Sequence, residues 1–166
     1  GDVYKRQLMF SATITGTIIT RYENAFAAIP LLVSFIPMLM DTGGNCGSQS
    51  STLIIRGIAL GEIQFSDLFR VMFKEFRVSL IVGVALALAN GIRILIMYKN
   101  AGLALVIGLS LVATIVISKL IGCVLPLIAK KLHMDPAIMA SPLITTLVDT
   151  CSILIYFNIA TQVFQL

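Results

Sequence analysis

Long apolar runs separated by clustered charges are the feature that most constrains this sequence. Of its 166 residues 58% are hydrophobic and only 12% charged, and the mean hydropathy is +0.98. Soluble domains carry about a quarter charged residues, so this composition is typical of membrane proteins. Lipid offers no partner to an unpaired backbone N–H or C=O group, so apolar runs of this kind predict helices. The sequence therefore predicts an all-α integral membrane protein.

We expect five transmembrane helices in a single domain, because a chain of this length holds about five spans of roughly 20 residues with short loops. The apolar runs place them at residues 8–21, 25–60, 76–98, 101–129 and 135–164. The segment "GEIQFSDLFRVMFKE", residues 61–75, has Phe, Leu and Met at helical spacing, which predicts an amphipathic helix on the membrane surface. The leading "GDVYKRQ", residues 1–7, differs in character from the apolar run that begins at Leu8, and we expect a non-native or truncated head before a pore domain of residues 8–166.

The basic residues predict an orientation. With the N-terminus inside, eight Lys and Arg residues fall on the cytoplasmic side and three on the other, with Lys119 inside a span and not counted. Because cytoplasmic loops retain Lys and Arg, this favours a cytoplasmic N-terminus and an extracellular or periplasmic C-terminus. The expected location is the plasma (inner) membrane, with the chain crossing it several times.

Several classes of function are disfavoured. The net charge of +4 comes without a basic stripe or interleaved aromatic residues, so we expect no nucleic-acid partner. Cys46, Cys123 and Cys151 show no CxxC or Cys/His spacing, and we interpret them as packing residues. No HExxH, GxSxG, GxGD or Walker motif occurs, so the sequence does not indicate an enzyme or an ATP-driven pump.

Asp149 is the strongest candidate for function. It lies well inside the last span, in "SPLITTLVDTCSILIYF". Ionisable groups at such depth are costly and by default mark an ion or proton path. The alternative is a buried ion pair with Lys119 in the fourth span.

Asp135 is a second candidate. If the last helix begins there, Asp135, Thr145 and Asp149 share one broad face, with Ser141 at its edge, as in a polar stripe along a water-filled path. Asp135 followed by Pro136 is equally typical of a helix cap.

The polar stretch "DTGGNCGSQSS" in the second span is the third candidate. Gly43, Gly44 and Gly47 permit close backbone approach, and ordinary helix packing through GxxxG is one reading. Packing does not require the other polar residues, Asp41, Asn45 and Gln49. We therefore expect the second helix to be broken here, with backbone and amide groups on an ion pathway.

Three segments together resemble the MgtE family of magnesium channels. They are "TGGNCGSQSSTLIIRGIALGEI" (Thr42–Ile63), "FKE" (Phe73–Glu75) and "MDPAIMASPLITTLVDTCSILIYF" (Met134–Phe157), and the resemblance extends from about Leu8 to Leu166. It implies a homodimer with five helices per subunit and a central pore lined by the second and fifth. It further implies that Asp149 of both subunits holds a hydrated Mg²⁺, that Asp135 lies near the cytoplasmic end of the pathway, and that Gly43, Gly44 and Asn45 approach the pore.

The ion chemistry agrees with this resemblance. Mg²⁺ keeps most of its waters and is held by one or two carboxylates, so two Asp149 side chains would balance its charge. Nearby hydroxyls would contact the water shell, with candidates Ser141, Thr145 and Thr146. The predicted function is passive Mg²⁺ transport down the electrochemical gradient, with Mg²⁺ as the bound and transported ion and with a second copy and membrane lipid as partners. Alternatives are Mn²⁺ or Co²⁺ transport, ion-coupled exchange, or a non-conducting membrane interaction module.

The sequence departs from the family pattern in places. Family members usually carry a large cytosolic Mg²⁺-sensing part, and we expect none here, so that gating is absent or the chain is a fragment. Lys119 stands where a neutral residue is expected, and Asp41 is an extra acid. Glu75, beside Lys74, is interpreted as a solvated interfacial charge, with contact to the ion as the alternative.

Overall fold

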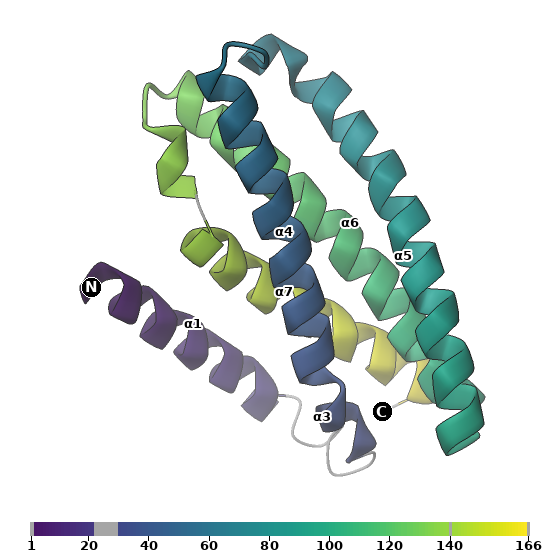
Figure 1. Cartoon of the computed structure of the whole chain (residues 1–166). Coiled ribbons are helices and arrows are strands. Elements are labelled where there is room, and N and C mark those ends of the chain that lie inside the picture. The colour runs from purple at the N-terminus through teal and green to yellow at the C-terminus, as the bar shows by residue number, and fades with distance from the viewer. Residues whose placement is uncertain (1, 22–29, 140, 166) are drawn as a thin grey trace.

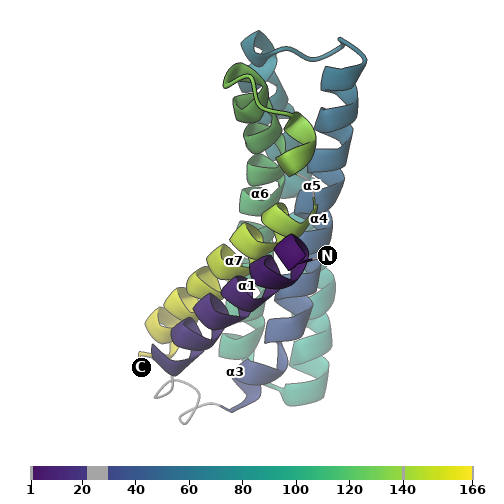
Figure 2. The same cartoon turned by 90° about the vertical axis from the view of Figure 1, so that its left-hand side faces the viewer.

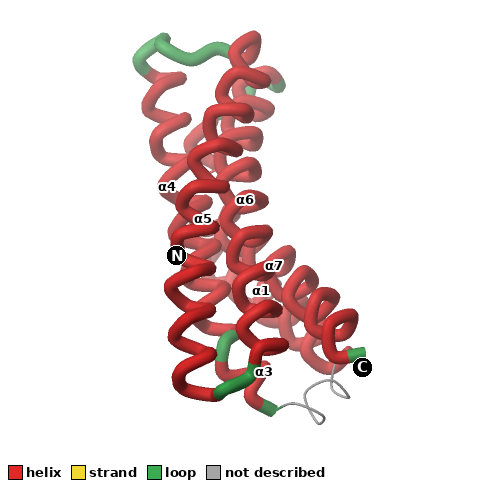
Figure 3. Tube along the Cα trace, turned by 90° about the vertical axis from the view of Figure 1, so that its right-hand side faces the viewer, coloured by secondary structure: helices red, strands yellow, loops and turns green. Residues whose placement is uncertain are grey.

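The computed structural model describes residues 2–21, 30–139 and 141–165, and its long elements are all helices (Figures 1 and 3). The long helices are α1 (Asp2–Arg21), α4 (Ile36–Ala59), α5 (Leu68–Tyr98), α6 (Ala101–Lys131) and α7 (Ser141–Phe164). Short turns of helix are α3 (Leu31–Ser34), η1 (Phe65–Asp67) and η2 (Pro136–Met139). The predicted all-α class is confirmed. The leading residues from Asp2 onward belong to α1, and whether they are native stays a prediction.

Helix α6 is the centre of the bundle. It packs against α4, α5 and α7, and α1 lies along α7, tilted against the other helices (Figure 2). The main buried cluster joins residues of every long helix, among them Ile18, Leu39, Ile94, Leu111 and Phe157. A smaller cluster of Ile54, Ile58, Cys123 and Leu127 lies between α4 and α6.

Three helices in the described part of the chain are long and apolar enough to cross a membrane. They are Phe65–Tyr98, Ala101–Lys131 and Pro136–Phe164. Helix α4 has 24 residues, but the polar stretch after Asp41 lowers its hydropathy. The membrane class is therefore supported, while the count of five spans stays a prediction.

The start of α5 differs from the prediction of a separate surface helix. Residues 68–75 form the first turns of one helix that runs on to Tyr98. The backbone N–H of Gln64 donates to Asp67 Oδ2 at 3.0 Å, which caps the preceding turn. No Gly or Pro interrupts the sequence between Leu68 and Gly83, so nothing stops the helix once it has started.

The expected break at the glycine-rich stretch is wrong. Helix α4 is continuous through it, and the interruption lies earlier, at Phe35 between α3 and α4. The glycines serve packing: a Cβ on Gly43 would lie 2.8 Å from Val148 Cγ1, and one on Gly47 would lie 2.7 Å from Ile144 Cγ2. Each helical glycine costs about 1 kcal/mol relative to alanine, and close contact with α7 offsets this cost.

The last predicted helix is also divided. Residues Pro136–Met139 form the 3₁₀ turn η2 and α7 begins at Ser141, with Ala140 outside the described residues. Because α7 starts after Asp135, that residue and Asp149 do not lie on one α-helix. The helical-face argument that joined them therefore fails.

The glycine contacts predict graded effects of alanine. We expect Gly47→Ala to destabilise the protein by about 1–3 kcal/mol, as overpacking does, because its Cβ would also lie 3.2 Å from the Ser118 carbonyl oxygen. Gly44→Ala is the matched control, since its Cβ would lie 3.5 Å from Thr145 Cγ2, an ordinary contact. Thermal unfolding in detergent measures both, and equal melting temperatures for the two variants would contradict this packing role.

Candidate ion-binding site

A cavity of about 300 Å³ lies between α4 and α7. Most of the residues that line it are polar, and Met40 and Gly44 complete the wall. The polar side chains are Asp41, Asn45 and Ser48 from α4 and Thr145 and Asp149 from α7. Carboxylate, amide and hydroxyl oxygens thus meet in one place.

The antiparallel packing of α4 and α7 brings these residues level with one another. Gly47 lies against Ile144, and Gly43 lies against Val148, so residue numbers fall on one helix as they rise on the other. Continuing in this register places Asp149 level with Thr42, one residue from Asp41. Farther along α7, Tyr156 Oη donates a hydrogen bond of 2.6 Å to the Leu32 carbonyl oxygen and so joins α7 to α3, just before α4.

Asp149 has an unsatisfied oxygen. Its Oδ1 is buried, and no donor in the described part of the chain bonds to it. A buried carboxylate oxygen without a partner is costly, because the water lost on burial is not replaced. Since the cavity adjoins this side chain, a ligand there would supply the missing interaction.

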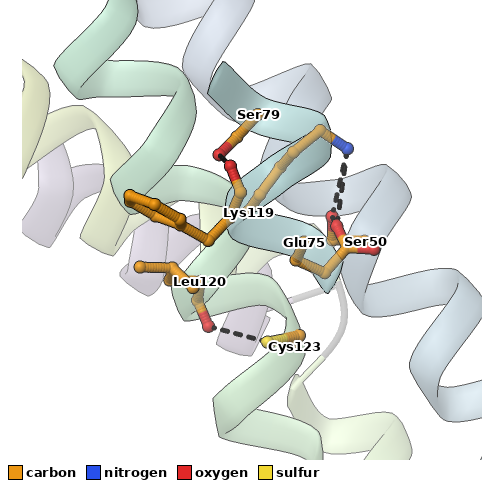
Figure 4. A network of polar contacts seen from close by, with 7 residues as sticks. Ser50, Glu75, Ser79, Lys119, Leu120 and Cys123 are labelled. Atoms are coloured by element: carbon orange, nitrogen blue, oxygen red, sulfur yellow. Dashed lines mark hydrogen bonds and ion pairs between the residues drawn. The ribbon is translucent and has the colours of Figure 1, made fainter. Parts of the chain in front are cut away.

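Lys119 does not pair with Asp149, so that alternative is wrong. Its Nζ lies 3.5 Å from Glu75 Oε2 and 3.5 Å from Ser50 Oγ, and Ser50 Oγ donates to the same Glu75 oxygen at 2.8 Å (Figure 4). The Lys119 and Glu75 side chains are only 12% and 13% exposed. The interpretation of Glu75 as a solvated charge is therefore also wrong. The pair joins α4, α5 and α6 on the side of α4 opposite the cavity.

The other predicted residues lie in several places. Asp135 is exposed, and its Oδ1 accepts a 3.0 Å hydrogen bond from the Ala137 backbone N–H, so it caps η2. Thr146 donates to the Pro142 carbonyl oxygen at 2.9 Å and does not line the cavity. Gln49 lines a neighbouring cavity of about 400 Å³ with Ser48, Thr52 and Leu53. The side chain of Ser141 lies outside the described residues.

Sequence reasoning did not single out Ser48 or Ser50. Asp41, Asn45, Ser48 and Thr52 recur at intervals of four, three and four residues, which places them on one helical face. That spacing could have predicted that Ser48 lies on the same face as Asp41 and Asn45. Ser50 carried no comparable signal, because its partners lie on two other helices.

Comparisons of the sequence with known proteins identify its family. The sequence model of MgtE, described as a divalent cation transporter, matches residues 36–159, which include both sides of the cavity. The chain belongs to the MgtE family. Within the described residues, no group of three or more His, Cys, Asp or Glu side chains is arranged to hold a metal ion.

Three MgtE relatives, each named a magnesium transporter, align with nearly the whole chain. Identity is 40% over 154 residues to that of Bacillus subtilis, 35% over 154 to that of Thermus thermophilus and 34% over 155 to that of Enterococcus faecalis. The alignments cover 93%, 92% and 93% of this chain. The chain spans about a third of each relative's length, 34% in all three cases.

The ion pair predicts a pattern of rescue. Lys119→Met leaves the Glu75 carboxylate buried and unpaired, and breaking a buried pair in this way costs about 3–5 kcal/mol. Adding Glu75→Gln removes that charge, so the double variant should recover most of the melting temperature. Asp149→Asn in the Lys119→Met background is the control and should recover none. Rescue by Asp149→Asn would show that the two groups interact after all.

Proposed function

We propose that the chain forms the ion-conducting part of a magnesium transporter. Mg²⁺ passes through a dimeric, channel-like pore, passively and down its electrochemical gradient. The observation that carries the proposal is Asp149: a carboxylate on a membrane-spanning helix, with a buried unpartnered oxygen beside a polar cavity. The names of the relatives support magnesium as the ion.

The lining of the cavity suits a hydrated ion. Mg²⁺ dehydrates reluctantly and is bound by one or two carboxylates through a retained water shell. Asp149 supplies the charge, and Asn45, Ser48 and Thr145 supply amide and hydroxyl groups that hold waters. Among the described residues, no imidazole or thiol lines the cavity. Its hard oxygen donors favour Mg²⁺ over zinc or copper.

A polar stripe on α4 extends the path beyond the cavity. The neighbouring cavity shares Ser48 with the first and continues along Gln49 and Thr52, with Leu53 as its apolar wall. Irregular or polar surface at membrane depth is tolerated where it lines a water-filled path. The ion therefore moves along the face of α4 that carries Asp41, Asn45, Ser48 and Thr52.

A second copy of the chain completes the site. Asp41 and Asn45 are exposed, so the cavity is open on one side of a single chain. A partner related by two-fold symmetry presents the same surface and adds a second Asp149. The two Asp149 carboxylates then balance the charge of one divalent ion. Gly43 is excluded from the pore lining in this arrangement, because it packs against Val148 and Thr114.

Uptake of Mg²⁺ into liposomes under an imposed inside-negative potential tests the proposal. We expect the unaltered chain to conduct and Asp149→Ala to reduce the rate by about tenfold or more, since each factor of ten needs only about 1.4 kcal/mol of lost interaction. Asp2→Asn, which removes an exposed carboxylate that does not line the cavity, is the matched control. Equal uptake by Asp149→Ala at matched folding would overturn the proposal, and no uptake by any form would favour the non-conducting module.

The same liposomes separate magnesium from its alternatives. Mn²⁺ and Co²⁺ share the charge of Mg²⁺ but bind nitrogen and oxygen ligands more tightly. If the ion stays hydrated, an equal concentration of either should slow Mg²⁺ uptake by less than about twofold. Strong inhibition at low concentration would indicate direct coordination and a Mn²⁺ or Co²⁺ transporter instead.

A further inference from the structure

We propose that a second cavity, between the end of α4 and the start of α5, binds the headgroup of phosphatidylethanolamine. This cavity measures about 350 Å³ and lies apart from the ion site, sharing no lining residue with it. Its walls combine four charged side chains, Arg56, Glu62, Lys74 and Glu75, with aliphatic ones such as Leu53 and Leu60.

The cavity lies where a membrane-spanning helix meets the headgroups. It is formed by the last turns of α4, the connecting loop and the first turns of α5. Phe69 and Phe73 on those turns are 81% and 62% exposed, and Lys131 Nζ lies 4.3 Å from the centre of the Phe65 ring at the same end of the bundle. Exposed Phe side chains on a helix that also carries basic residues are typical of segments that lie at the membrane interface.

The charges that remain available in the cavity match a zwitterion. Glu75 is already compensated by Lys119 and Ser50. Arg56, Lys74 and Glu62 also line the cavity, and within the described residues none of the three takes part in a salt bridge. Two cations and one carboxylate complement a phosphate joined to an ammonium group: the guanidinium and the lysine bind phosphate, and the carboxylate binds the ammonium.

The apolar walls fit the rest of a phospholipid. Leu53 and Leu60 are 62% and 60% exposed at the rim, so they can contact acyl chains. On the inner wall Ile63 packs directly against Gly57, which leaves no space for a Cβ at that glycine. Basic pockets between membrane helices commonly bind lipid headgroups. A divalent cation is disfavoured here, because Arg56 and Lys74 would repel it.

The choice among lipids follows from Glu62. Phosphatidylcholine has no N–H donor for this carboxylate, and phosphatidylglycerol has no positive charge. Both therefore lose an interaction that phosphatidylethanolamine keeps. Free phosphate satisfies Arg56 and Lys74 alone and loses the contacts with Leu53 and Leu60.

Native mass spectrometry of the detergent-solubilised chain tests the proposal by titration with the three lipids at equal acyl length. We expect phosphatidylethanolamine to bind about tenfold more tightly than the other two, as expected for one charge-assisted hydrogen bond. Arg56→Gln and Lys74→Gln should each weaken its binding by about tenfold, whereas Arg56→Lys should retain most of it. Glu62→Gln should remove the preference over phosphatidylglycerol. Arg70→Gln is the matched control, since Arg70 is exposed at the same end and does not line the cavity.

Three outcomes would overturn the proposal. Equal binding of all three lipids would indicate non-specific lipid contact, or another occupant such as a second copy. Tighter binding of phosphatidylglycerol, unaffected by Glu62→Gln, would indicate a site that recognises phosphate alone. Displacement of lipid by inorganic phosphate at equal concentration would indicate a free phosphate site. Asp149→Ala should leave lipid binding unchanged, so this inference and the transport function fail or succeed separately.

Discussion

The close approach of α4 to α6 and α7 is the constraint on which the rest of the structure depends. Gly43 and Gly47 bring the α4 backbone against Val148 and Ile144 of α7, and Gly122 of α6 lies directly against the Gly47 carbonyl group. In lipid, helices associate through such van der Waals packing, since apolar burial gives little driving force. With Gly43 and Gly47 buried in these contacts, the neighbouring residues Asp41, Asn45 and Ser48 line the cavity beside α7.

Helix α4 therefore has one face that packs against other helices and one that lines the cavity. The small residues pack, and Ser50 on the same side accepts and donates hydrogen bonds within the Lys119–Glu75 pair. The polar residues of the other face remain exposed or half-buried beside Asp149. Of the two interpretations of this stretch, close packing through its glycines is observed, whereas the polar path on the other face stays a prediction.

Sequence reasoning could predict the elements whose signals are local. The helical class follows from composition, and the turn between α5 and α6 follows from Lys99 and from Asn100, whose side chain caps α6 by accepting a 3.1 Å hydrogen bond from Leu103 N–H. The grouping of Asp149 with Gly44, Asn45 and Thr145 could also be predicted from the sequence, because each is polar or small within an apolar span.

Three features could not be predicted from the sequence. The continuity of α4 depends on packing against other helices, which offsets the cost of its glycines. The partner of Lys119 is set by contacts between helices that are distant in sequence. The start of α7 after η2 has no local sequence marker beyond Pro136.

The Lys119–Glu75 pair also bears on how the chain enters the membrane. Either charge buried alone is costly, whereas the two together are neutral. They lie on α5 and α6, which are joined by only Lys99 and Asn100 and pack along their length. The physically favoured order of assembly is then insertion of α5 and α6 together as a helical hairpin, with the charges already matched. Helix α4 completes the unit when Ser50 reaches the pair.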